Sequence, residues 1–286
     1  MTTRSAAHPR LPLQLPIDKR WKGGEERWRT PGEVFDPRAF GVDVIPEREA
    51  KQFVIAEHYS HAFPAARLSV GLFRCAPAHK ELVGVAVFAV PMNGNTIPRY
   101  TLLPAQEGVE LSRLVLRDDV AYNGESWFVT RAFAALRAHK TDVRAVISYA
   151  DPLERRDPIT GDLQKRAHYG VVYQALSAFF GGRATARHLL VAPDGTIISE
   201  RALSKIRTGE RGCDYATRQL VAAGAPARAP HEDPREWLER AIAAPGFRKI
   251  WHPGNFCYVF AWEKAVRARL ATHLSGPACY PRKAAA

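Results

Sequence analysis

Cysteine is scarce in this sequence, and long apolar runs are missing. The four cysteines are scattered over 286 residues and form no C-x-x-C pair. This spacing argues against a zinc ribbon and a disulfide scaffold and favours a reducing compartment. No apolar stretch approaches the roughly 18 residues that span a bilayer, and the first residues contain no apolar segment typical of a secretory signal. We therefore expect a cytoplasmic protein with no membrane partner.

Several common enzyme motifs are also missing. The sequence contains no G-x-S-x-G elbow, no P-loop and no G-x-G-x-x-G after a predicted strand. The commonest hydrolase, ATPase and dinucleotide-binding functions are therefore disfavoured.

Positive charge, in contrast, is abundant. Lys and Arg number 41 against 29 Asp and Glu, which gives a formal net charge of +12. Such an excess favours a polyanionic partner, and double-stranded DNA is the first candidate. The alternative is a general basic bias of composition that serves solubility. The hydrophobic share of 46% is sufficient for an ordinary packed core.

Residues 1–45 are rich in Pro, Arg and Gly and resemble an extended arm. The arm either lies over the domain or contacts nucleic acid, with its cations on phosphates and its tryptophans available to stack. The candidate DNA contacts are Lys19, Arg20, Trp21, Lys22, Arg27 and Trp28.

The remaining pattern predicts a mixed α/β sheet with a helix after each of two central strands. We expect strands over 81–91, 109–116, 143–149 and 256–262, a hairpin around 194–195, and an irregular loop or strand over 94–104. We expect helices from Pro46, from about Asn123, over 168–180 with a stop at Gly181-Gly182, at 199–206, at 233–243 and at the basic C-terminal end.

The strand at 109–116 carries an unusual charge. Its period of two places Arg113 on the same face as Val109, Leu111 and Val115. Burying an unpaired guanidinium is costly, so a structural carboxylate or the anionic group of a ligand is expected beside it.

The polar turn that follows this strand leads into a helix. Asn123 is a favoured N-cap, and Ser126 lies in the first turn. The amides of residues 124–127 suit the pyrophosphate of a cofactor, and plain helix capping is the alternative. A neighbouring strand would deliver Asp151, as a general base, a metal ligand or a turn former.

Two further features carry chemistry. Tyr173 is either a proton donor and acceptor or a core tyrosine with a satisfied hydroxyl. His58 and His61 have the i, i+3 spacing of a helical metal pair but lack a third ligand in sequence.

Taken together, the segments "HYS", "ELSRLVLRDD", "NGESWFVTRAFAAL", "ISYAD" and "GVVYQA" resemble the Mom family of phage DNA-modification proteins. The resemblance is clearest over about 55–175. It implies a GNAT-like acyltransferase fold, with a mostly antiparallel twisted sheet flanked by helices. It also implies addition of a carbamoylmethyl group to adenine N6 in DNA, which protects phage DNA from restriction in the host cytoplasm.

The same resemblance implies roles for individual residues. Arg113 and Ser126, with the turn residues Asn123 and Gly124, would hold the phosphates of acetyl-CoA or shape the turn. The reacting centre would be surrounded by Tyr59, Asp151 and Tyr173. Iron or another metal held by Tyr59 and Asp151 is a further implication. The turn "LRDDVAYNGES" lacks the glycine-rich pattern of ordinary GNAT enzymes, as the Mom family does.

The chain departs from the family pattern between "YADP" and "YGVVYQ", where it inserts a polar segment at about 153–167 that we expect to form a surface loop. His168 then takes the place of the family's histidine. We expect an arm at 1–45, a catalytic domain at 46–265 and a basic helix and tail at 266–286. Two alternatives to adenine modification stay open: a GNAT acyltransferase acting on another amine, in a modified pyrimidine or a small molecule, and a catalytically silent DNA-binding protein of the same fold.

Overall fold

The computed structural model describes residues 34–156, 160–161, 163–274 and 279–282. The six DNA contacts predicted in the N-terminal arm, Lys19 to Trp28, lie outside these residues. The chain divides into two compact units, each built from two separate stretches. The first unit comprises Met1–Phe88 and Arg113–His139, and the second comprises Ala89–Ser112 and Lys140–Ala286.

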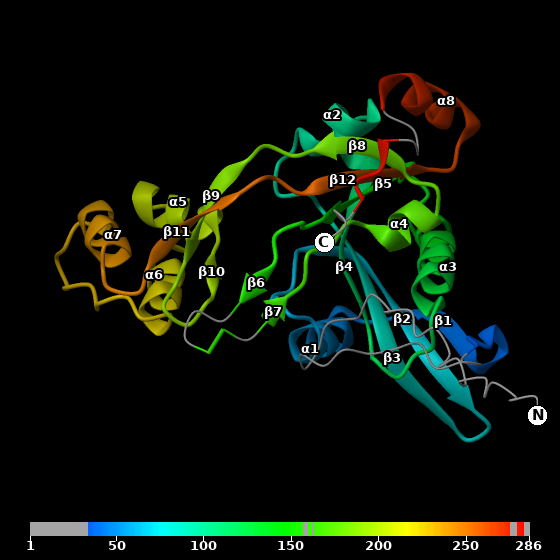
Figure 1. Cartoon of the computed structure of the whole chain (residues 1–286), viewed down its shortest axis with the longest axis horizontal. Helices are drawn as coiled ribbons and strands as arrows, with labels where there is room; N and C mark the ends of the chain where they lie inside the picture. The colour runs from blue at the N-terminus through cyan, green and yellow to red at the C-terminus, as the bar shows by residue number, and fades with distance from the viewer. Residues whose placement is uncertain (1–33, 157–159, 162, 275–278, 283–286) are drawn as a thin grey trace, which may run out of the picture. The chain divides into compact units, whose positions relative to one another are not determined.

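The strands form a large, mostly antiparallel mixed sheet, and the strand β4 (Gly108–Leu116) contributes to both units. In the first unit the strand order is β1 (Phe40–Val44), β2 (Ala66–Ala76), β3 (His79–Ala89) and the second half of β4. Long β2 and β3 are drawn in cyan in Figure 1. Antiparallel β1 and β2 pair from Phe40 with Arg74 to Val44 with Val70.

Helices cover both faces of the sheet in the first unit. The helix α1 (Glu47–Glu57) buries Phe53 and Val54 in one core with Val85 and Val87 of β3. The helix α3 (Gly124–His139) fully buries its apolar stripe of Phe128, Val129, Ala132 and Leu136. Its Phe133 ring lies 6.0 Å from the ring of Phe88. Because side chains alternate along β3, Phe88 lies on the face opposite to Val87, so α3 covers the face that α1 does not.

In the second unit the sheet continues from the first half of β4 through β5 (Ala145–Ala150), β12 (Phe256–Ala261) and β8 (Phe179–Arg183). β4 and β5 run parallel, whereas β5 with β12 and β12 with β8 are antiparallel. The helices α2 (Thr96–Thr101) and α8 (Lys264–His273) pack on one face, where Ile97, Val266 and Leu270 join the core of Ile147 and Val259. This unit also contains the 3-10 turn η2 (Ala105–Glu107), and the first contains η1 (Pro37–Ala39).

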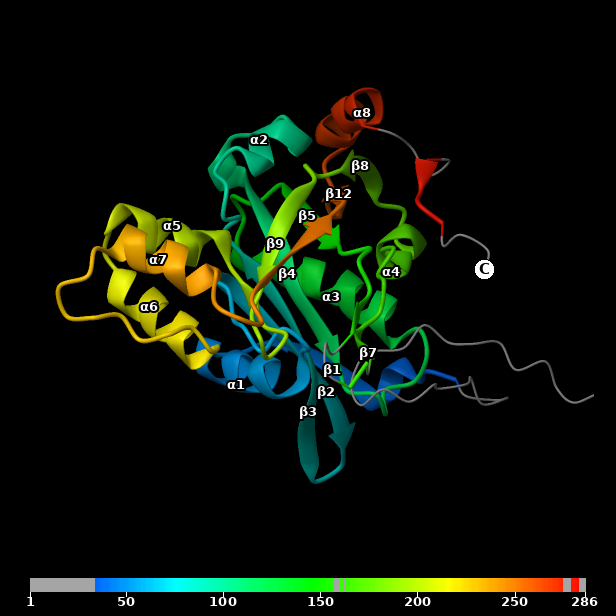
Figure 2. The same ribbon diagram turned by 60° about the vertical axis from the view of Figure 1, so that its left-hand side comes forward.

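A second, smaller core lies in the same unit. A three-stranded sheet has the order β10 (Ile197–Ile198), β9 (Arg187–Val191), β11 (Arg248–His252). The helices α5 (Glu200–Thr208), α6 (Cys213–Ala222) and α7 (Pro234–Ile242) gather beside it (Figure 2). Trp237 is fully buried there with Leu190 and Leu220. Residues 187–252 therefore have a core of their own.

The expected mixed α/β architecture is confirmed, and so are most of its elements. Three local expectations are wrong. The segment at 94–104 contains α2, because Pro98 falls in the first turn of a helix, where its missing N–H is harmless. The helix at 168–180 is only α4 (Val171–Ala175), and Gly181-Gly182 lie inside β8. The 153–167 insertion is a hairpin of β6 (Arg155–Arg156) and β7 (Leu163–Lys165) with a buried lysine, not a plain surface loop.

β1 lies before the expected 46–265 domain, and α8 extends across its C-terminal boundary. β1 is an edge strand paired with β2, and α8 contributes buried side chains to the core of the second unit. Within the described residues, no helix combines the length and the apolar character that a bilayer crossing requires.

Candidate active-site residues

The carboxylate of Asp151 is the centre of a polar network in the second unit. Asp151 directly follows β5, and its Oδ1 accepts hydrogen bonds from Nε2 of His252 at 2.9 Å and from the Leu153 amide at 2.9 Å. Its Oδ2 faces the Arg155 guanidinium at 3.3 Å and Nζ of Lys165 at 3.4 Å. Four donors thus surround one carboxylate, and the network includes residues from β5, the insertion and β11.

His252 has a defined tautomer in this network. Its Nδ1 accepts the Gly254 amide at 3.0 Å, so the ring proton lies on Nε2 and is donated to Asp151. The side chain is 1% exposed, so it is held in place by packing as well as by the two hydrogen bonds. This arrangement fixes the direction in which the carboxylate of Asp151 points.

Lys165 is a buried residue of the insertion and belongs to the polar network around Asp151. Its Nζ donates to the carbonyl oxygens of Asp151 at 2.8 Å, Leu153 at 2.8 Å and Arg166 at 3.0 Å. Burial lowers the pKa of Lys165 to about 8, against the opposing effect of Asp151. The amine therefore ties both ends of the insertion to the strand end that carries Asp151.

Asp151 is held in its ionised form. Burial by itself would raise the pKa of Asp151. The charge of Lys165, the Leu153 amide, the His252 hydrogen bond and the charge of Arg155 together outweigh burial, and the pKa lies below its usual value. A carboxylate in this state is an acceptor and a fixed negative charge.

Tyr173 lies in the same unit as Asp151, and His168 connects the two. The His168 amide donates to the carbonyl oxygen of Asp151 at 2.9 Å, and its ring lies edge-on to Tyr173 at 6.0 Å. Tyr173 is 5% exposed and lies in an aromatic cluster, 5.4 Å from the ring of Tyr258 and 6.1 Å from that of Phe260. The structure thus brings Asp151, His168 and Tyr173 to one region of the second unit.

The aromatic cluster has its own polar contacts. Tyr258 donates to the carbonyl oxygen of Tyr169 and accepts from Nε2 of Gln174 at 2.9 Å. Burial raises the pKa of Tyr258 to about 12. Tyr258 is therefore a protonated hydrogen-bond donor beside Tyr173 at neutral pH.

In the first unit the structure brings Arg113 to the "HYSH" segment. Nε of Arg113 donates to the carbonyl oxygen of Ala62 at 2.9 Å, three residues beyond Tyr59. This partner is a backbone group. Tyr59 is 38% exposed and packs on His58, with ring centroids 4.3 Å apart.

His58 and His61 do not lie on a helix, because α1 ends at Glu57. Nδ1 of His58 contacts the Ser60 hydroxyl at 2.8 Å, and Nδ1 of His61 contacts the carbonyl oxygen of Ile55 at 2.8 Å. The helical metal pair is therefore wrong, and the two imidazoles organise the turn after α1.

The turn before α3 matches its predicted position but is more closed than expected. Asn123 caps the helix through its carbonyl oxygen, which accepts the Trp127 amide at 3.2 Å and the Ser126 hydroxyl at 3.1 Å. The Gly124 amide donates to Ala121 at 3.1 Å. Two of the four amides expected to be open to a ligand are thus used within the turn.

Gly124 is required here by packing. A Cβ at this position would lie 2.7 Å from the Val120 side chain and 3.3 Å from the Phe35 ring. The acidic Glu125 follows in the first turn of α3, which opposes an anion at the helix start. The turn therefore fits the pyrophosphate of acetyl-CoA only in part.

A metal ion fits the Asp151 carboxylate poorly. Two of its four neighbours are cationic side chains, and a carboxylate offers about four lone-pair positions. Among the residues that the structure describes, no group of three or more His, Cys, Asp or Glu could hold a metal. Iron on Tyr59 and Asp151 stays a prediction.

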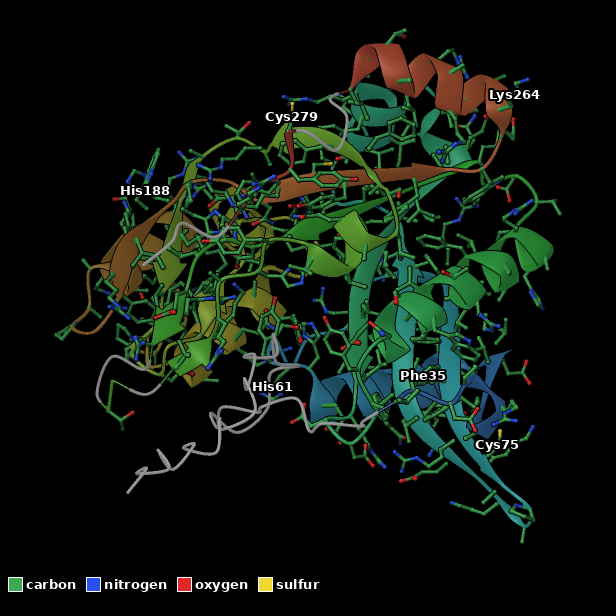
Figure 3. All side chains as sticks on the ribbon, turned by 45° about the vertical axis from the view of Figure 1, so that its right-hand side comes forward. Phe35, His61, Cys75, His188, Lys264 and Cys279 are labelled. Atoms are coloured by element: carbon green, nitrogen blue, oxygen red, sulfur yellow. The ribbon has the colours of Figure 1, made fainter. Side chains whose placement is uncertain are left out.

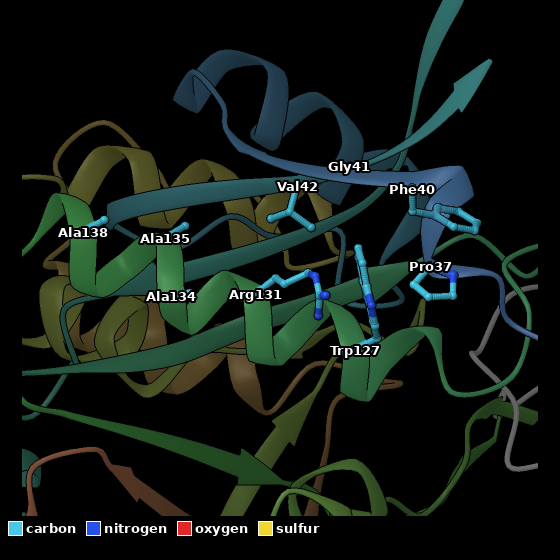
Figure 4. Close-up of a pocket in the computed structure, with 9 residues that line it drawn as sticks. All are labelled: Pro37, Phe40, Gly41, Val42, Trp127, Arg131, Ala134, Ala135 and Ala138. Carbon is cyan, nitrogen blue, oxygen red and sulfur yellow. The ribbon is translucent and has the colours of Figure 1, made fainter. Parts of the chain in front are cut away.

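Sequence reasoning missed one further feature of the first unit, a shallow groove of about 560 Å³ between β1 and α3 (Figure 4). Three alanines of α3 line it, and the Arg131 guanidinium lies 3.8 Å from the Trp127 ring centroid at one end. Among the residues that the structure describes, none of the predicted site residues lines this groove.

Comparison with known proteins identifies the family. A family model described as the Mom protein family matches residues 39–281. The chain belongs to the Mom family. A Mom relative, the methylcarbamoylase Mom of Escherichia phage Mu, is 30% identical over 175 residues, which cover 60% of this chain and 65% of that protein. The chain thus matches just under two thirds of that relative's length.

Two solved structures show distant similarity to this Mom-family chain. The malonyl-CoA decarboxylase of Rhodopseudomonas palustris is 11% identical with a TM-score of 0.32, and the alignment covers 82% of this chain and 59% of that one. The enzyme of the same name from Agrobacterium vitis is 12% identical with a TM-score of 0.31, covering 85% and 66%.

Proposed function

We propose that this Mom-family protein is a transferase that modifies adenine in DNA at the N6 amino group, as part of the protection of phage DNA. The family match over residues 39–281 carries the proposal. The formal charge of +12 supports DNA as the substrate, because phosphate neutralisation provides most sequence-independent affinity. The N6 amino group takes part in base pairing, so the reaction requires base flipping or access from a groove.

The acyl-derived group that we propose is carbamoylmethyl, and the proposed donor is acetyl-CoA bound through a GNAT-like fold. The polar turn into α3, with Asn123, Gly124 and Ser126, supports a binding role for this segment. Its two engaged amides limit that role, so we propose that Arg113 and the remaining groups of the first unit orient the donor rather than enclose its phosphates.

Asp151, Tyr59 and Tyr173 are the proposed residues of the reaction. Asp151 is ionised and fixed by four donors, which suits a carboxylate that holds and orients an amino group by accepting its hydrogen bond. Tyr173, buried among aromatic rings, is suited to position a neighbouring hydrogen-bond donor such as His168 or Tyr258. The two side chains share one region of the second unit through His168.

Mass spectrometry of nucleosides from DNA co-expressed with the protein tests the proposal. We expect a modified deoxyadenosine with the wild type and none with Asp151→Asn, while both proteins bind DNA with similar affinity. An acylated pyrimidine beside unmodified deoxyadenosine would instead support an acyltransferase that acts on another amine. Unmodified nucleosides in both samples, with tight DNA binding, would support a silent DNA-binding protein.

A further inference from the structure

The segment β8–β9 and the segment β11–β12 pair with each other and form one long antiparallel ribbon. β8 pairs with β12, the Ala184 amide donates to the Asn255 carbonyl at 2.8 Å, and β9 then pairs with β11 as far as Arg248 with Val191. Figure 1 shows β8 continuing into β9 and β11 into β12, side by side along their length. The ribbon joins the main sheet of the second unit to the smaller sheet of the same unit.

The ribbon is strongly basic. Its two strands, residues 179–191 and 247–261, contain no Asp or Glu, and they carry four cations, Arg183, Arg187, Arg248 and Lys249. All four are exposed, and within the described part of the chain none of them forms an ion pair. Arg183 lies over the Phe256 ring at 4.8 Å, and all four side chains are exposed to an outside partner.

An aromatic pair lies among these cations. Trp251 is 59% exposed, and its ring meets that of His188 on the paired strand at 5.2 Å in an edge-on arrangement. Figure 3 shows His188 on the outside of the ribbon. Alternation along β11 places Lys249 on the same face as Trp251, and Arg248 and the paired Arg187 on the face of His252. An exposed aromatic ring beside unpaired cations is the combination that binds phosphates and stacks on a base.

The opposite face of the same strand leads to the candidate active-site residues. His252 follows Trp251 in sequence, points to the other face and donates to Asp151 at 2.9 Å. Trp251 is therefore adjacent to His252 in sequence but lies on the opposite face of the strand from Asp151.

We propose that the ribbon of β8–β9 and β11–β12 is the double-stranded DNA contact of this protein. Lys249 and Arg248, one on each face of β11, would contact the phosphates on either side of a groove, and Trp251 would stack on a base displaced from the duplex. A two-stranded β-ribbon has the width to enter the major groove. The proposal deepens the proposed function, and it rests on that function only for the identity of the polyanion.

The test measures binding to a fluorescent DNA duplex by anisotropy at several salt concentrations. Arg248→Gln combined with Lys249→Gln lowers the slope of log affinity against log salt by about 1.8, because each lost phosphate contact contributes about 0.9. The matched control is Arg218→Gln with Arg235→Gln, two exposed arginines on α6 and α7, which removes the same charge and leaves the slope unchanged. If the ribbon variant and the control variant lower this slope equally, the ribbon is not the DNA contact.

Trp251 has its own measurement. Trp251→Ala weakens binding to a duplex with a single mismatch by roughly fivefold or more, and weakens binding to the intact duplex less, because a mismatched base is easier to displace. Trp251→Phe keeps a stacking ring and restores most of the preference. A Trp251→Ala protein that retains the folded circular-dichroism spectrum and the wild-type preference for the mismatch would rule out stacking.

Nucleoside analysis of the same proteins separates the two proposals. If the wild type modifies DNA and the ribbon variants bind and modify as it does, the ribbon proposal fails and the function stands. If the ribbon variants lose DNA binding but no protein modifies DNA, the ribbon stands and the transferase function fails. If the ribbon substitutions weaken binding to double-stranded RNA or polyglutamate more than they weaken binding to DNA, DNA is not the partner of the ribbon.

Discussion

Nε2 of His252 lies 2.9 Å from Oδ1 of Asp151, although 101 residues separate the two in sequence. Because Nδ1 of the same ring accepts the Gly254 amide, Nε2 carries the hydrogen that is donated to Asp151, and the two hydrogen bonds fix the orientation of the ring. A buried ring bonded on both sides holds the Asp151 carboxylate more rigidly than a flexible side chain would. The ribbon strand β11 is therefore mechanically connected to the strand end at β5.

Two substitutions at His252 separate its hydrogen bonds. In His252→Asn the amide oxygen falls near the Nδ1 position and keeps the Gly254 contact, while the donor to Asp151 is lost. In His252→Gln the amide nitrogen reaches toward the Nε2 position and keeps that donor. We expect His252→Asn to lower the free energy of unfolding by about 2 kcal/mol more than His252→Gln does, because only His252→Asn loses a hydrogen bond to a buried charge. Urea unfolding at neutral pH measures the difference, and equal losses would show that the Asp151 contact contributes little.

Lys165 predicts a pH dependence of stability. Its folded pKa is lowered to about 8 from 10.5, so between these values the folded protein has released a proton that the unfolded chain still binds. Stability attributable to Lys165 therefore rises with pH across this window, by about 3 kcal/mol in total. Lys165→Met lacks this titration.

Urea unfolding of the wild type and Lys165→Met at a series of pH values from 7 to about 10.5 tests the prediction. Other titrating groups are common to the two proteins and cancel in the difference. The free energy of unfolding of the wild type should increase relative to the variant as the pH rises. A difference that stays constant would show that the amine titrates normally.

Gly170 predicts a steric effect on the helix that carries Tyr173. It precedes α4 with φ +75°, and a Cβ there would overlap the Tyr258 ring. Gly170→Ala should lower the free energy of unfolding by about 3 kcal/mol, from overpacking added to backbone strain. Gly161, with φ +76° and open space around it, is the control, and Gly161→Ala should cost only about 1 kcal/mol. Thermal unfolding followed by circular dichroism compares the two, and similar losses would contradict a steric role of Tyr258.

Substitution of Ser126 should affect acetyl-CoA binding more than it affects the free energy of unfolding. Its hydroxyl donates to Asn123, so Ser126→Ala should change the free energy of unfolding by no more than about 1 kcal/mol. If the turn also orients acetyl-CoA, the KM for acetyl-CoA in a DNA-modification assay rises while the affinity for duplex DNA stays the same. Calorimetric titration with acetyl-CoA provides a readout that does not depend on turnover. Unchanged acetyl-CoA binding would limit Ser126 to helix capping.

The periodic elements of this protein follow from local sequence. The alternation at 109–116 and the apolar stripe of α3 predict β4, α3 and the charge of Arg113 on an apolar face, because side-chain periods of 2 and 3.6 are fixed by backbone geometry. The family motifs mark Asp151 and Tyr173 in the same way, since each is short and continuous in sequence.

The glycines at 181–182 show where local reasoning ends. A Gly-Gly pair after a helical run normally indicates a helix stop, but here it lies in a strand. A Cβ at Gly181 would lie 3.0 Å from the Tyr100 side chain and 3.2 Å from Sγ of Cys257. The glycine is required by neighbours from two other elements, which no window around residue 181 contains.

The sequence by itself determined the family, the class of fold, the basic charge and the candidate residues that lie inside continuous motifs. Only the tertiary structure decided that Lys165 and His252 surround Asp151, and that Trp251 is exposed on a basic ribbon. These contacts join segments 14 and 101 residues apart, and they depend on strand pairing and burial. Both properties belong to the folded chain as a whole, because the free energy that selects them comes from packing between distant elements.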